Sequence, residues 1–351
     1  MYFNKYEFTT LEIVLLALTA VLGIVTIVDD MVLAPRRRLR STQPVPVSLG
    51  MRAMQIGFLL LFLRMMYQMV KHSALDFSFV LVVAVTLCGL IWLVDRFFLR
   101  PQRLLLAQQQ GKPLGEADVE STTVEYGVSF FPVILVVLLI RSFLLEPFRI
   151  PSDSMMPTLF DGDFIFVNKY AYGLRLPVTN TKIVEIGAPQ RGDVIVFRLP
   201  TDPSINYIKR LVGLPGDHVV VRENQVYING SPMTQTLDGK YSDTHGYFDA
   251  QLAKEHLGDV THTVMFTQDR SSRDYEAQVP AGHYFFMGDN RNNSQDSRFP
   301  QVGFVPEENL VGRAVRIWMN WRGKEMPVWS RIGTKIEWRA RILLVPLDNG
   351  P

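Results

Sequence analysis

The sequence YGVSFFPVILVVLLIRSFLLEPFRIPSDSMMPTL, residues 126–159, passes from an apolar segment into a polar one. Tyr126 to Ile140 carries no charge, and the apolar run continues past Arg141 to Leu145, about the length that crosses the hydrocarbon core of a bilayer. From Phe148 onward the chain changes to short alternating runs separated by Gly, Pro and Asp, a pattern typical of strands. The stretch therefore joins a predicted membrane anchor to a predicted β-rich domain.

Three further apolar runs precede this one, so the sequence predicts an anchor of four spans. They cover about residues 11–28, 54–70 and 77–94, and the fourth covers about 126–145. Residues 77–94 give the strongest signal because all eighteen are uncharged. Residues 54–70 give the weakest, because Arg64 would put a charge in the bilayer at a cost of about 3 kcal/mol. The alternative for each run is a buried helix of a soluble protein.

The placement of Lys and Arg predicts the orientation of the anchor. Residues 29–52 and 95–125 are rich in basic side chains, whereas residues 1–10 and 71–76 offer only Lys5 and Lys71. The positive-inside rule puts the two rich connections in the cytoplasm and everything after about residue 146 outside it. The first run lacks a basic cluster before it and a small-x-small site after it, so we expect it to stay uncleaved. The basic residues are Arg36, Arg37, Arg38, Arg40, Arg52, Arg96, Arg100, Arg103 and Lys112.

An internal repeat at an offset of 66 residues links the first and third runs. Chance could supply the apolar matches within the helices, but it explains the shared Asp, Pro and Arg at the helix exits less well, so a duplicated anchor is the better interpretation. The identical residues are Val14, Leu15, Gly23, Val28, Asp29, Leu33, Pro35, Arg37 and Leu39, which match Val80, Leu81, Gly89, Val94, Asp95, Leu99, Pro101, Arg103 and Leu105.

After Phe148 the pattern predicts a mostly β domain of about 200 residues. Within it, VVVRENQVYING predicts a hairpin turning at Glu223 and Asn224, followed by a turn at Asn229 and Gly230. Residues 231–280 are polar and poorly patterned, which suggests a variable excursion. The predicted strands are Asp163–Val167, Val194–Leu199, Tyr207–Leu214, His218–Ile228, Tyr284–Met287 and Leu310–Trp321.

Composition excludes several classes of protein. A net charge of +2 over 351 residues argues against a nucleic-acid binder. The one cysteine, Cys88, cannot form an intramolecular disulfide, and no Cys/His cluster has the spacing of zinc ligands. The chain has no GxxxxGK[ST], GxGxxG or HExxH motif, so we expect neither a cofactor nor a metal.

Two serines directly after the last apolar run are candidate nucleophiles. Ser152 and Ser154 lie between Pro151 and Pro157, which restrict the backbone. A serine hydroxyl needs a base, and none of the six histidines is in a persuasive place. Lys209, in the apolar run NYIKRLVG, is the other option, although most strand lysines are solvated edge residues. To act as a base near pH 7 to 8 its pKa must fall by about 2 to 3 units, which burial in an apolar environment provides.

A third polar segment, MGDNRNNSQDSR (residues 287–298), follows the strand at 284–287. In isolation it would be a solvated loop. Alternatively, Asp296 pairs with Arg298 or Arg210, which would fix the loop and hold Ser294 near Lys209.

The chain resembles bacterial type I signal peptidase, a membrane-bound Ser/Lys endopeptidase, over roughly residues 77–335. The resemblance rests on seven ordered blocks: the FFP…EPF span (130–148), IPSxSMMPTL, GDFIxVxKxAYG (162–173), RGDVIVF, YIKRxVGLPGD, GDNRxNSxDSR and GFVPExNLVGRA (303–314). It implies a multi-pass protein of the bacterial cytoplasmic membrane, with the β-rich catalytic domain on the periplasmic side. The implied partners are signal-peptide-bearing preproteins, membrane lipid and the export translocon.

Carried over by position, the resemblance implies the roles of the site residues. Ser154 would be the nucleophile, Lys209 the general base, and the Ser152 hydroxyl with the Ser154 amide the oxyanion hole. Ser294 would orient Lys209, while Asp296, Arg298 and Arg210 would support the site. Shallow pockets would accept small side chains at substrate positions −1 and −3, and the matching wall residues are Phe148, Ile150, Pro151, Met155, Leu159, Ile165, Val196, Tyr207 and Ile208. Without the resemblance, these wall residues would be assigned to an ordinary core.

The predicted domains are an extra anchor (1–73), a family-type anchor (74–147), the catalytic domain (148–335) and a C-terminal tail (336–351). The chain departs from the family pattern at Asp153, where Gly is common, and we expect Asp153 to face solvent. The pair of extra spans and the tail, whose Trp338, Arg339 and Arg341 would rest on the lipid interface, are further departures. Two alternatives to an active signal peptidase are an inactive scaffold that binds the export machinery and a self-cleaving Ser/Lys regulator.

Overall fold

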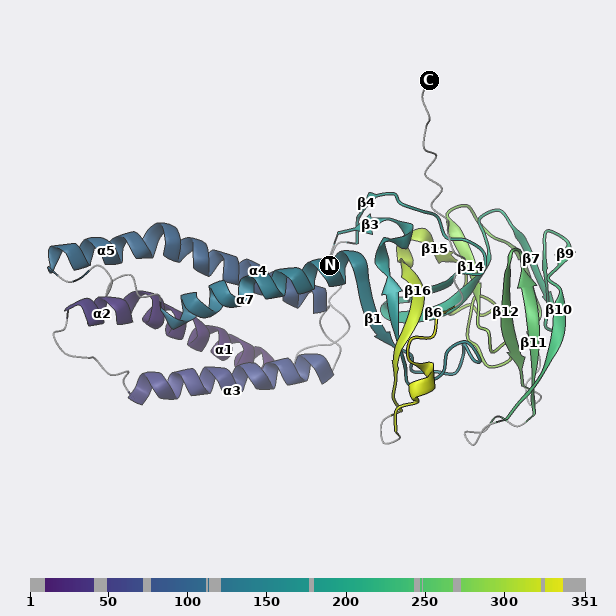
Figure 1. The fold of residues 1–351 in the computed structure, drawn as a ribbon, viewed down its shortest axis with the longest axis horizontal. Coiled ribbons are helices and arrows are strands. Elements are labelled where there is room, and N and C mark those ends of the chain that lie inside the picture. Colours follow the sequence, from purple (N-terminus) through teal and green to yellow (C-terminus); the bar gives the residue numbers. More distant parts are fainter. Residues whose placement is uncertain are drawn as a thin grey trace, which may run out of the picture. The chain divides into compact units, whose positions relative to one another are not determined.

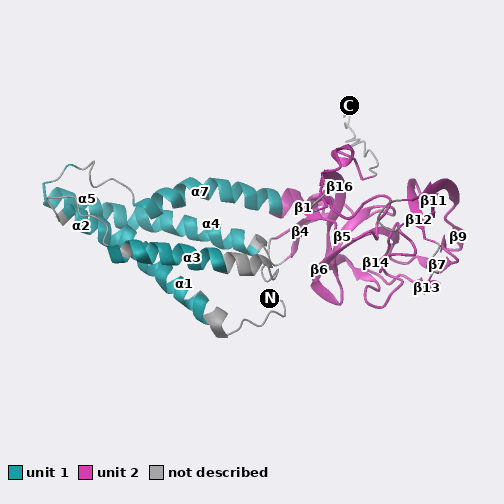
Figure 2. Ribbon diagram, turned by 90° about the horizontal axis from the view of Figure 1, so that it is seen from below, with its two compact units in different colours: residues 1–141, 177–179 teal, residues 142–176, 180–351 magenta. Residues whose placement is uncertain are grey.

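The chain folds into two compact units in the computed structural model, and each unit is described by itself (Figure 2). Unit 1 comprises residues 1–141 with 177–179, and unit 2 comprises residues 142–176 with 180–351. The structure describes residues 10–40, 49–71, 77–111, 113, 121–176, 180–242, 247, 249–267, 273–322 and 326–336. The predicted lipid contact of Trp338, Arg339 and Arg341 lies outside the described residues.

Unit 1 is helical, and its three longest apolar segments form α1, α4 and α7, the last of which contains Pro132 (Figure 1). Helix α1 packs beside α3, and α4 packs beside α7. Ser121 caps the start of α7 by accepting a hydrogen bond from the Val124 amide at 3.4 Å. The helices are α1 (Thr10–Val28), α2 (Ala34–Arg40), α3 (Leu49–Lys71), α4 (Phe77–Val94), α5 (Arg100–Gln109) and α7 (Thr122–Leu139), with π-helical segments η1 (Asp29–Leu33), η2 (Asp95–Leu99) and η3 (Ile140–Leu144).

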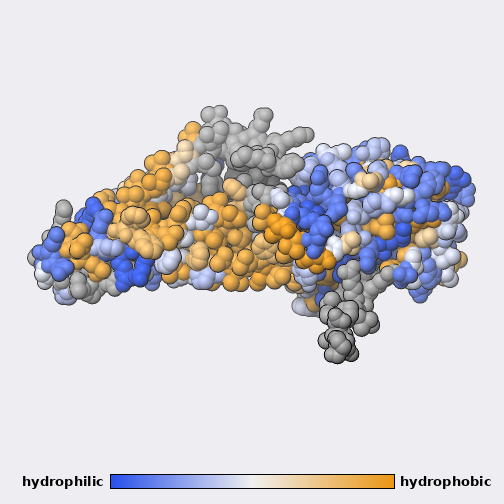
Figure 3. Space-filling model, turned by 90° about the horizontal axis from the view of Figure 1, so that it is seen from above, coloured by the Kyte–Doolittle hydropathy of each residue, from blue (hydrophilic) through white to orange (hydrophobic). Residues whose placement is uncertain are grey.

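Three helical segments in the described part of the chain are long and apolar enough to cross a membrane, not the four predicted. They are Ala17–Leu39, Phe79–Gln109 and Thr122–Leu144. Residues 54–70 do lie in a helix, α3, but this helix is not among the three. Helix α3 carries Arg52, Arg64 and Lys71. Figure 3 shows the apolar side chains spread over the surface of the helical unit, whereas unit 2 is covered mainly by polar ones.

Unit 2 is built on a seven-stranded antiparallel sheet in the order β1-β2-β16-β5-β6-β14-β15. The strands are β1 (Leu145–Arg149), β2 (Asp163–Asn168), β5 (Val194–Leu199), β6 (Asp202–Gly213), β14 (His283–Met287), β15 (Val305–Pro306) and β16 (Leu310–Asn320). Strands β5 and β14 carry consecutive buried apolar residues, so the sheet buries side chains on both faces there. The predicted strands in these regions are therefore confirmed to within a few residues.

Three smaller sheets complete unit 2. The hairpin predicted at 218–228 is confirmed as β7 and β8, and it turns at Glu223 (φ 48°) and Asn224 (φ 68°). Asn229 (φ 52°) and Gly230 (φ 79°) make the next turn, as expected for an Asn-Gly pair. The sheets are β10-β11-β12, β13-β7-β8-β9 and β3-β4, formed by β3 (Leu174–Arg175), β4 (Lys182–Val184), β7 (His218–Arg222), β8 (Gln225–Ile228), β9 (Ser231–Pro232), β10 (Gln235–Tyr241), β11 (Ala250–Leu257), β12 (Val260–Phe266) and β13 (Tyr275–Gln278).

The polar stretch 231–280 is more regular than its sequence suggests. It contains β9 to β13, and β11 pairs with β12 without a register shift from Gln251–Phe266 to Leu257–Val260. Its inward positions include charged side chains such as Glu255, so the apolar alternation that normally reveals a strand is weak.

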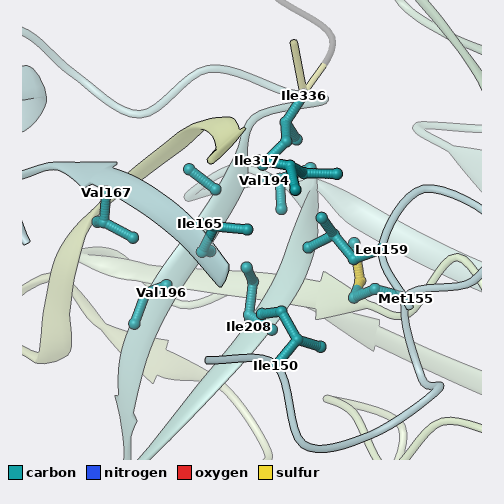
Figure 4. Packing of buried hydrophobic residues seen from close by; sticks show 11 residues of the cluster. Ile150, Met155, Leu159, Ile165, Val167, Val194, Val196, Ile208, Ile317 and Ile336 are labelled. Carbon is teal, nitrogen blue, oxygen red and sulfur yellow. The ribbon is translucent and has the colours of Figure 1, made fainter. Parts of the chain in front are cut away.

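The core beside the sheet is formed where β2, β5, β6 and β16 meet the segment after β1 (Figure 4). Ile165 and Ile317 are fully buried from neighbouring strands, and Met155 and Leu159 pack onto them from the segment that also carries the serines. The position of the candidate nucleophile is therefore fixed by apolar packing on either side of it in the sequence.

Candidate active site

The segment after β1 holds Ser154 in a buried turn. Ser154 is 8% exposed, and its neighbours Met155 and Met156 are fully buried. Asn290 fixes the backbone here, because its amide donates to the Ser154 carbonyl at 3.2 Å and its side-chain nitrogen donates to the Asp153 carbonyl at 3.1 Å. These bonds join the serine turn to the loop after β14.

The structure brings Lys209 to Ser154. Lys209 lies on β6 between β5 and β14, and it is 4% exposed. Its Nζ is 2.6 Å from Ser154 Oγ, and it donates a hydrogen bond to the Ile208 carbonyl at 3.0 Å. Burial lowers the pKa of Lys209 from 10.5 to about 8, against the opposing effect of the carboxylates of Asp296 and Asp289. A substantial fraction of the amine is therefore neutral near pH 8.

Ser152 is exposed and lies beside Ser154. Its Oγ is 3.3 Å from Ser154 Oγ, so the two hydroxyl groups point into the same region. An exposed hydroxyl next to a buried one is well placed to meet a substrate carbonyl that approaches from solvent.

The loop 287–298 is held by buried charges, as predicted. Arg298 Nε donates to Asp296 Oδ1 and Arg298 Nη2 donates to Asp296 Oδ2, both at 2.8 Å, and the Gly288 amide donates to Asp296 Oδ2 at 3.0 Å. The partner of Asp296 is thus Arg298 and not Arg210. Arg210 instead makes a bidentate pair with Asp289, at 2.8 and 2.6 Å, because both side chains are enclosed under the same loop.

Ser294 is close to the site but makes no hydrogen bond to Lys209. Its hydroxyl is buried and has no hydrogen-bond partner among the described residues. A Cβ built on Gly288 would collide with both the Ser294 side chain and the Ser154 carbonyl, so only glycine allows the three groups to pack so closely. The predicted orienting bond from Ser294 to Lys209 is absent from this arrangement, and the second partner of the amine is the Ile208 carbonyl.

Asp153 is partly exposed rather than fully solvent-facing. Its side chain is 30% exposed, accepts a hydrogen bond from the Asp161 amide at 3.3 Å and lies 3.9 Å from Arg322 Nη2. These contacts are with residues of the turn before β2 and the end of β16, and Asp153 is not among the charges that shift the pKa of Lys209.

The nine predicted wall residues are mostly buried. Phe148 packs at the edge of the core cluster of Figure 4, Tyr207 packs against the neighbouring cluster, and Pro151 is exposed. Six belong to the core cluster itself: Ile150, Met155, Leu159, Ile165, Val196 and Ile208. In this structure these six side chains pack against one another.

Several buried polar residues near the site were not predicted. Arg291 is paired with Glu255 of β11, and His262 of β12 lies 3.4 Å from Glu255 and 3.7 Å from Asp289. Thr158 donates to Asp289 at 2.6 Å. Asp289 and Arg291 lie in the quoted loop motif, but Glu255 and His262 lie in a stretch without apolar alternation. Among the described residues, no three His, Cys, Asp or Glu side chains are grouped so that they would hold a metal ion.

Comparison with known proteins agrees with this geometry. Residues 123–319 match the family model described as signal peptidase, peptidase S26. A signal peptidase I of Pseudomonas fluorescens is 47% identical over 282 residues, an alignment covering 74% of this chain and 99% of that protein. The chain belongs to this signal peptidase family.

Two further relatives have the same name. A signal peptidase I of Pseudomonas aeruginosa is 47% identical over 281 residues, covering 74% of this chain and 98% of that protein. A solved signal peptidase I of Enterococcus faecalis is 31% identical and covers 37% of this chain and 98% of that chain, with a TM-score of 0.24. The family model includes the serine turn, β6 and the 287–298 loop of this S26 peptidase.

Proposed function

We propose that this chain is a membrane-bound serine endopeptidase that removes N-terminal signal peptides from exported preproteins. The observation that carries the proposal is the buried amine of Lys209, with Nζ 2.6 Å from Ser154 Oγ and a pKa lowered to about 8. A hydroxyl becomes an effective nucleophile when a neutral base within hydrogen-bond reach accepts its proton. Membership of the signal peptidase family supports this assignment.

In the proposed mechanism, neutral Lys209 takes the proton of Ser154 Oγ as that oxygen attacks the scissile carbonyl carbon. The C–N bond then breaks, protonated Lys209 gives its proton to the leaving amine, and Ser154 carries the acyl group as an ester. A water molecule attacks this ester while Lys209 accepts its proton. The free Ser154 hydroxyl and the new carboxylate are the products.

The developing oxyanion would accept hydrogen bonds from the Ser152 hydroxyl and the Ser154 amide. The position of Ser152, exposed and 3.3 Å from Ser154 Oγ, supports this role. Loss of one such donor typically lowers the rate by about 100- to 1000-fold. Four residues would support the site: Ser294, Asp296, Arg298 and Arg210. The ion pair Asp296–Arg298 holds the 287–298 loop, and the ion pair Arg210–Asp289 ties that loop to β6, the strand that carries Lys209.

We also propose that cleavage follows a small residue at −1, with a small residue at −3. This proposal is supported by the place of six of the predicted wall residues, which are buried in one core cluster and include Met155, the residue after Ser154. Phe148, Pro151 and Tyr207 are the wall residues with accessible surface, and they would contact the substrate first.

The active unit would act at the outer face of the cytoplasmic membrane. The connection between α4 and α7 contains Arg96, Arg100 and Arg103, which the positive-inside rule places in the cytoplasm. Helix α7 would then lead outward, and Ser154 follows the end of η3 at Leu144 closely enough to stay near the membrane surface. Membrane lipid and the translocon would be the partners of the anchor. The proposed domains are the two anchors, residues 1–73 and 74–147, the catalytic domain, residues 148–335, and the C-terminal tail.

The test is cleavage of a preprotein with Ala at −3 and −1 by the purified full chain in detergent. We expect cleavage after the −1 residue, and its loss in Ser154→Ala and in Lys209→Ala. An intact preprotein would favour an inactive scaffold, and Ser154-dependent cutting of the chain itself without preprotein cleavage would favour a self-cleaving regulator. Ser204→Ala, at an exposed serine on β6, is the matched control and should retain full activity.

A further inference from the structure

The helical unit contains two helical hairpins, α1 with α3 and α4 with α7, and the same kind of contact joins the two helices of each. In the first hairpin, Gly23 of α1 lies against the ring of Phe58 of α3, and a Cβ at Gly23 would be 2.8 Å from that ring. In the second, Gly89 of α4 lies against Phe131 of α7, and a Cβ there would be 3.4 Å away. Gly23 and Gly89 are equivalent in the 66-residue repeat. Each hairpin therefore uses a glycine at the same point to let a phenylalanine approach.

The two hairpins also leave their first helices in the same way. Helix α1 runs into η1 and α4 runs into η2, and each of these π-helical segments begins with a buried aspartate. Asp29 pairs with Arg37 at 2.7 Å, and Asp95 pairs with Arg103 at 2.5 Å. Well under about 1% of residues in globular proteins are π-helical, so two such segments at equivalent positions are poorly explained by apolar composition alone.

The hairpins touch each other through equivalent positions. Arg36 Nη2 donates to Gln102 Oε1 at 3.1 Å, and these two residues are themselves 66 apart. A contact between a position and its own equivalent is what a two-fold axis produces. Beside it, Leu39 and Ala107 form a small buried cluster with Leu104 and Leu106. The ends of the two hairpins that carry the Asp–Arg pairs are thus packed together as two related halves.

One contact between the halves is not repeated among the residues that the structure describes. Asp30 Oδ2 accepts a hydrogen bond from the Thr123 amide at 2.7 Å, at the start of α7, where a helix favours negative charge. The equivalent of Asp30 is Arg96, whose positive charge is unsuited to a helix N-terminus. The bond can therefore form in one direction only, from the first hairpin to the second.

We propose that residues 10–71 are a duplicate of the 77–144 hairpin that serves as its built-in partner, in the place that a second chain would take in a two-fold assembly. The shared Gly–Phe contacts and Asp–Arg pairs give the copies one architecture. The Asp30–Thr123 bond makes the first hairpin bind the second hairpin more strongly than either hairpin would bind a copy of itself.

The test is thiol crosslinking between the two hairpins in the full chain. Arg36→Cys and Gln102→Cys are combined with Cys88→Ser, a protease site is inserted between α3 and α4, and a short bis-maleimide is added to the protein in detergent. We expect the two fragments to stay joined after cleavage, with no product between differently tagged chains. Gln102→Cys with Leu105→Cys, both exposed and on the same helix, shows that thiols at this end react.

Two results would overturn the proposal. One is that the two fragments of the Arg36→Cys, Gln102→Cys protein separate after cleavage although the control pair reacts. The other is that crosslinks form only between different chains. Adding Asp30→Asn should slow the initial rate of joining by about threefold, as for loss of a negative charge at a helix N-terminus, although the amide oxygen can still accept the hydrogen bond. Glu125→Gln removes the same charge from the same helix end at an exposed position and should leave the rate unchanged. Equal rates in these two variants would contradict the one-way contact.

Discussion

Lys209 is an amine that has lost nearly all contact with water. Burial disfavours its ammonium form, while Asp296 and Asp289 favour it, and the balance leaves the pKa at about 8 instead of 10.5. That difference corresponds to roughly 3 kcal/mol that folding must supply to keep the group buried at neutral pH. In the proposed mechanism, the same destabilisation of the charged form would let the amine act as a base for Ser154.

The pH dependence of the reaction should report this amine. Because neutral Lys209 is the active form, we expect kcat/KM to be constant above about pH 8 and to fall about tenfold per pH unit below it. Asp296 raises the pKa of Lys209, so Asp296→Asn should move the fall to lower pH. The measurement is kcat/KM against pH for a short preprotein-derived peptide, and an unchanged or higher apparent pKa in the variant would contradict the account.

Ser294 and Ser297 should respond differently to loss of their hydroxyl groups. Ser297 Oγ accepts a hydrogen bond from the Phe286 amide at 2.9 Å, whereas the Ser294 hydroxyl has no hydrogen-bond partner among the described residues. We expect Ser297→Ala to lower the free energy of unfolding by about 1 to 3 kcal/mol, because a buried amide is left unpaired. Ser294→Ala should change it by less than about 0.5 kcal/mol. Equal losses, measured by denaturant unfolding in detergent, would show that Ser294 is bonded in the folded protein.

At this scale the sequence predicted two residues that the structure brings together, Ser154 and Lys209, but not all of their surroundings. A serine between prolines and a lysine in an apolar strand made them candidates, and the family resemblance gave them their expected roles. The sequence could not predict which carboxylate pairs with Arg210, because Asp289 and Asp296 lie in the same loop. Which one binds depends on how the loop closes over β6.

At the scale of elements, β11 and β12 hold the loop that binds the backbone at Ser154. Glu255 of β11 is paired with Arg291, and the Arg291 amide donates to the Met265 carbonyl of β12 at 2.9 Å. Arg298 Nη2 in turn donates to the Arg291 carbonyl at 2.7 Å. The stretch that the sequence left as a variable excursion is thus tied to the loop whose Asn290 binds the Ser154 backbone.

Glu255→Gln should weaken this connection. It leaves the buried guanidinium of Arg291 without its carboxylate, a loss of about 3 to 5 kcal/mol for a buried pair. We expect the Tm of the catalytic unit to fall by roughly 10 °C. Glu276→Gln, at a half-exposed carboxylate that pairs with Arg222, is the matched control and should shift it by no more than about 3 °C. Similar shifts in both variants would show that Glu255 has no special structural role.

His262 of β12 should make the unit sensitive to acid. Burial and the charge of Arg210 hold the pKa of His262 well below 6.5, although Glu255 opposes them. The unfolded chain therefore binds a proton near pH 6.5 that the folded chain does not, and stability is lost as the pH falls below about 6.5. In His262→Gln this contribution should be absent. Thermal unfolding between pH 5 and 8 checks it, and identical pH slopes for the two proteins would contradict it.

The regular strands could be predicted and the excursion could not, for a physical reason. Strands β2, β5, β6, β14 and β16 carry Val, Ile and Phe toward a shared core, so the signal is local. In β11 and β12, buried positions are taken by Glu255 and His262, whose partners come from the distant 287–298 loop. No window of the sequence contains both halves of that interaction.

At the scale of the whole molecule, the sequence predicted a helical half before a β-rich half, and the structure has both. Three of the four predicted spans correspond to described segments that are long and apolar enough to cross a membrane, and the fourth, residues 54–70, lies in helix α3 with Arg64 inside it. The repeat that links the first two hairpins was visible because its Asp, Pro and Arg lie at helix exits. The hydrogen bond between Arg36 and Gln102 could not be predicted from the repeat, because it depends on how the two hairpins pack together.

The proposed orientation predicts that a protease reaches the β-rich unit from the outer side of the membrane only. If the connection between α4 and α7 is cytoplasmic, a protease added outside spheroplasts should digest the chain after residue 146 and spare the connection. Inside-out vesicles should give the opposite pattern. Digestion of the β-rich unit only in the inside-out vesicles would reverse the proposed placement of the active site.

The ionisation of Lys209 in the resting protein is the most direct measurement of the account. Lysine labelled with 13C at Cε gives a resonance whose shift follows the charge of the amine, and Lys209→Met identifies the signal by its loss. We predict that this signal titrates at about pH 8. A titration of Lys209 above pH 10 would mean that the amine is charged whenever the enzyme works, and the proposed proton transfer from Ser154 would be wrong.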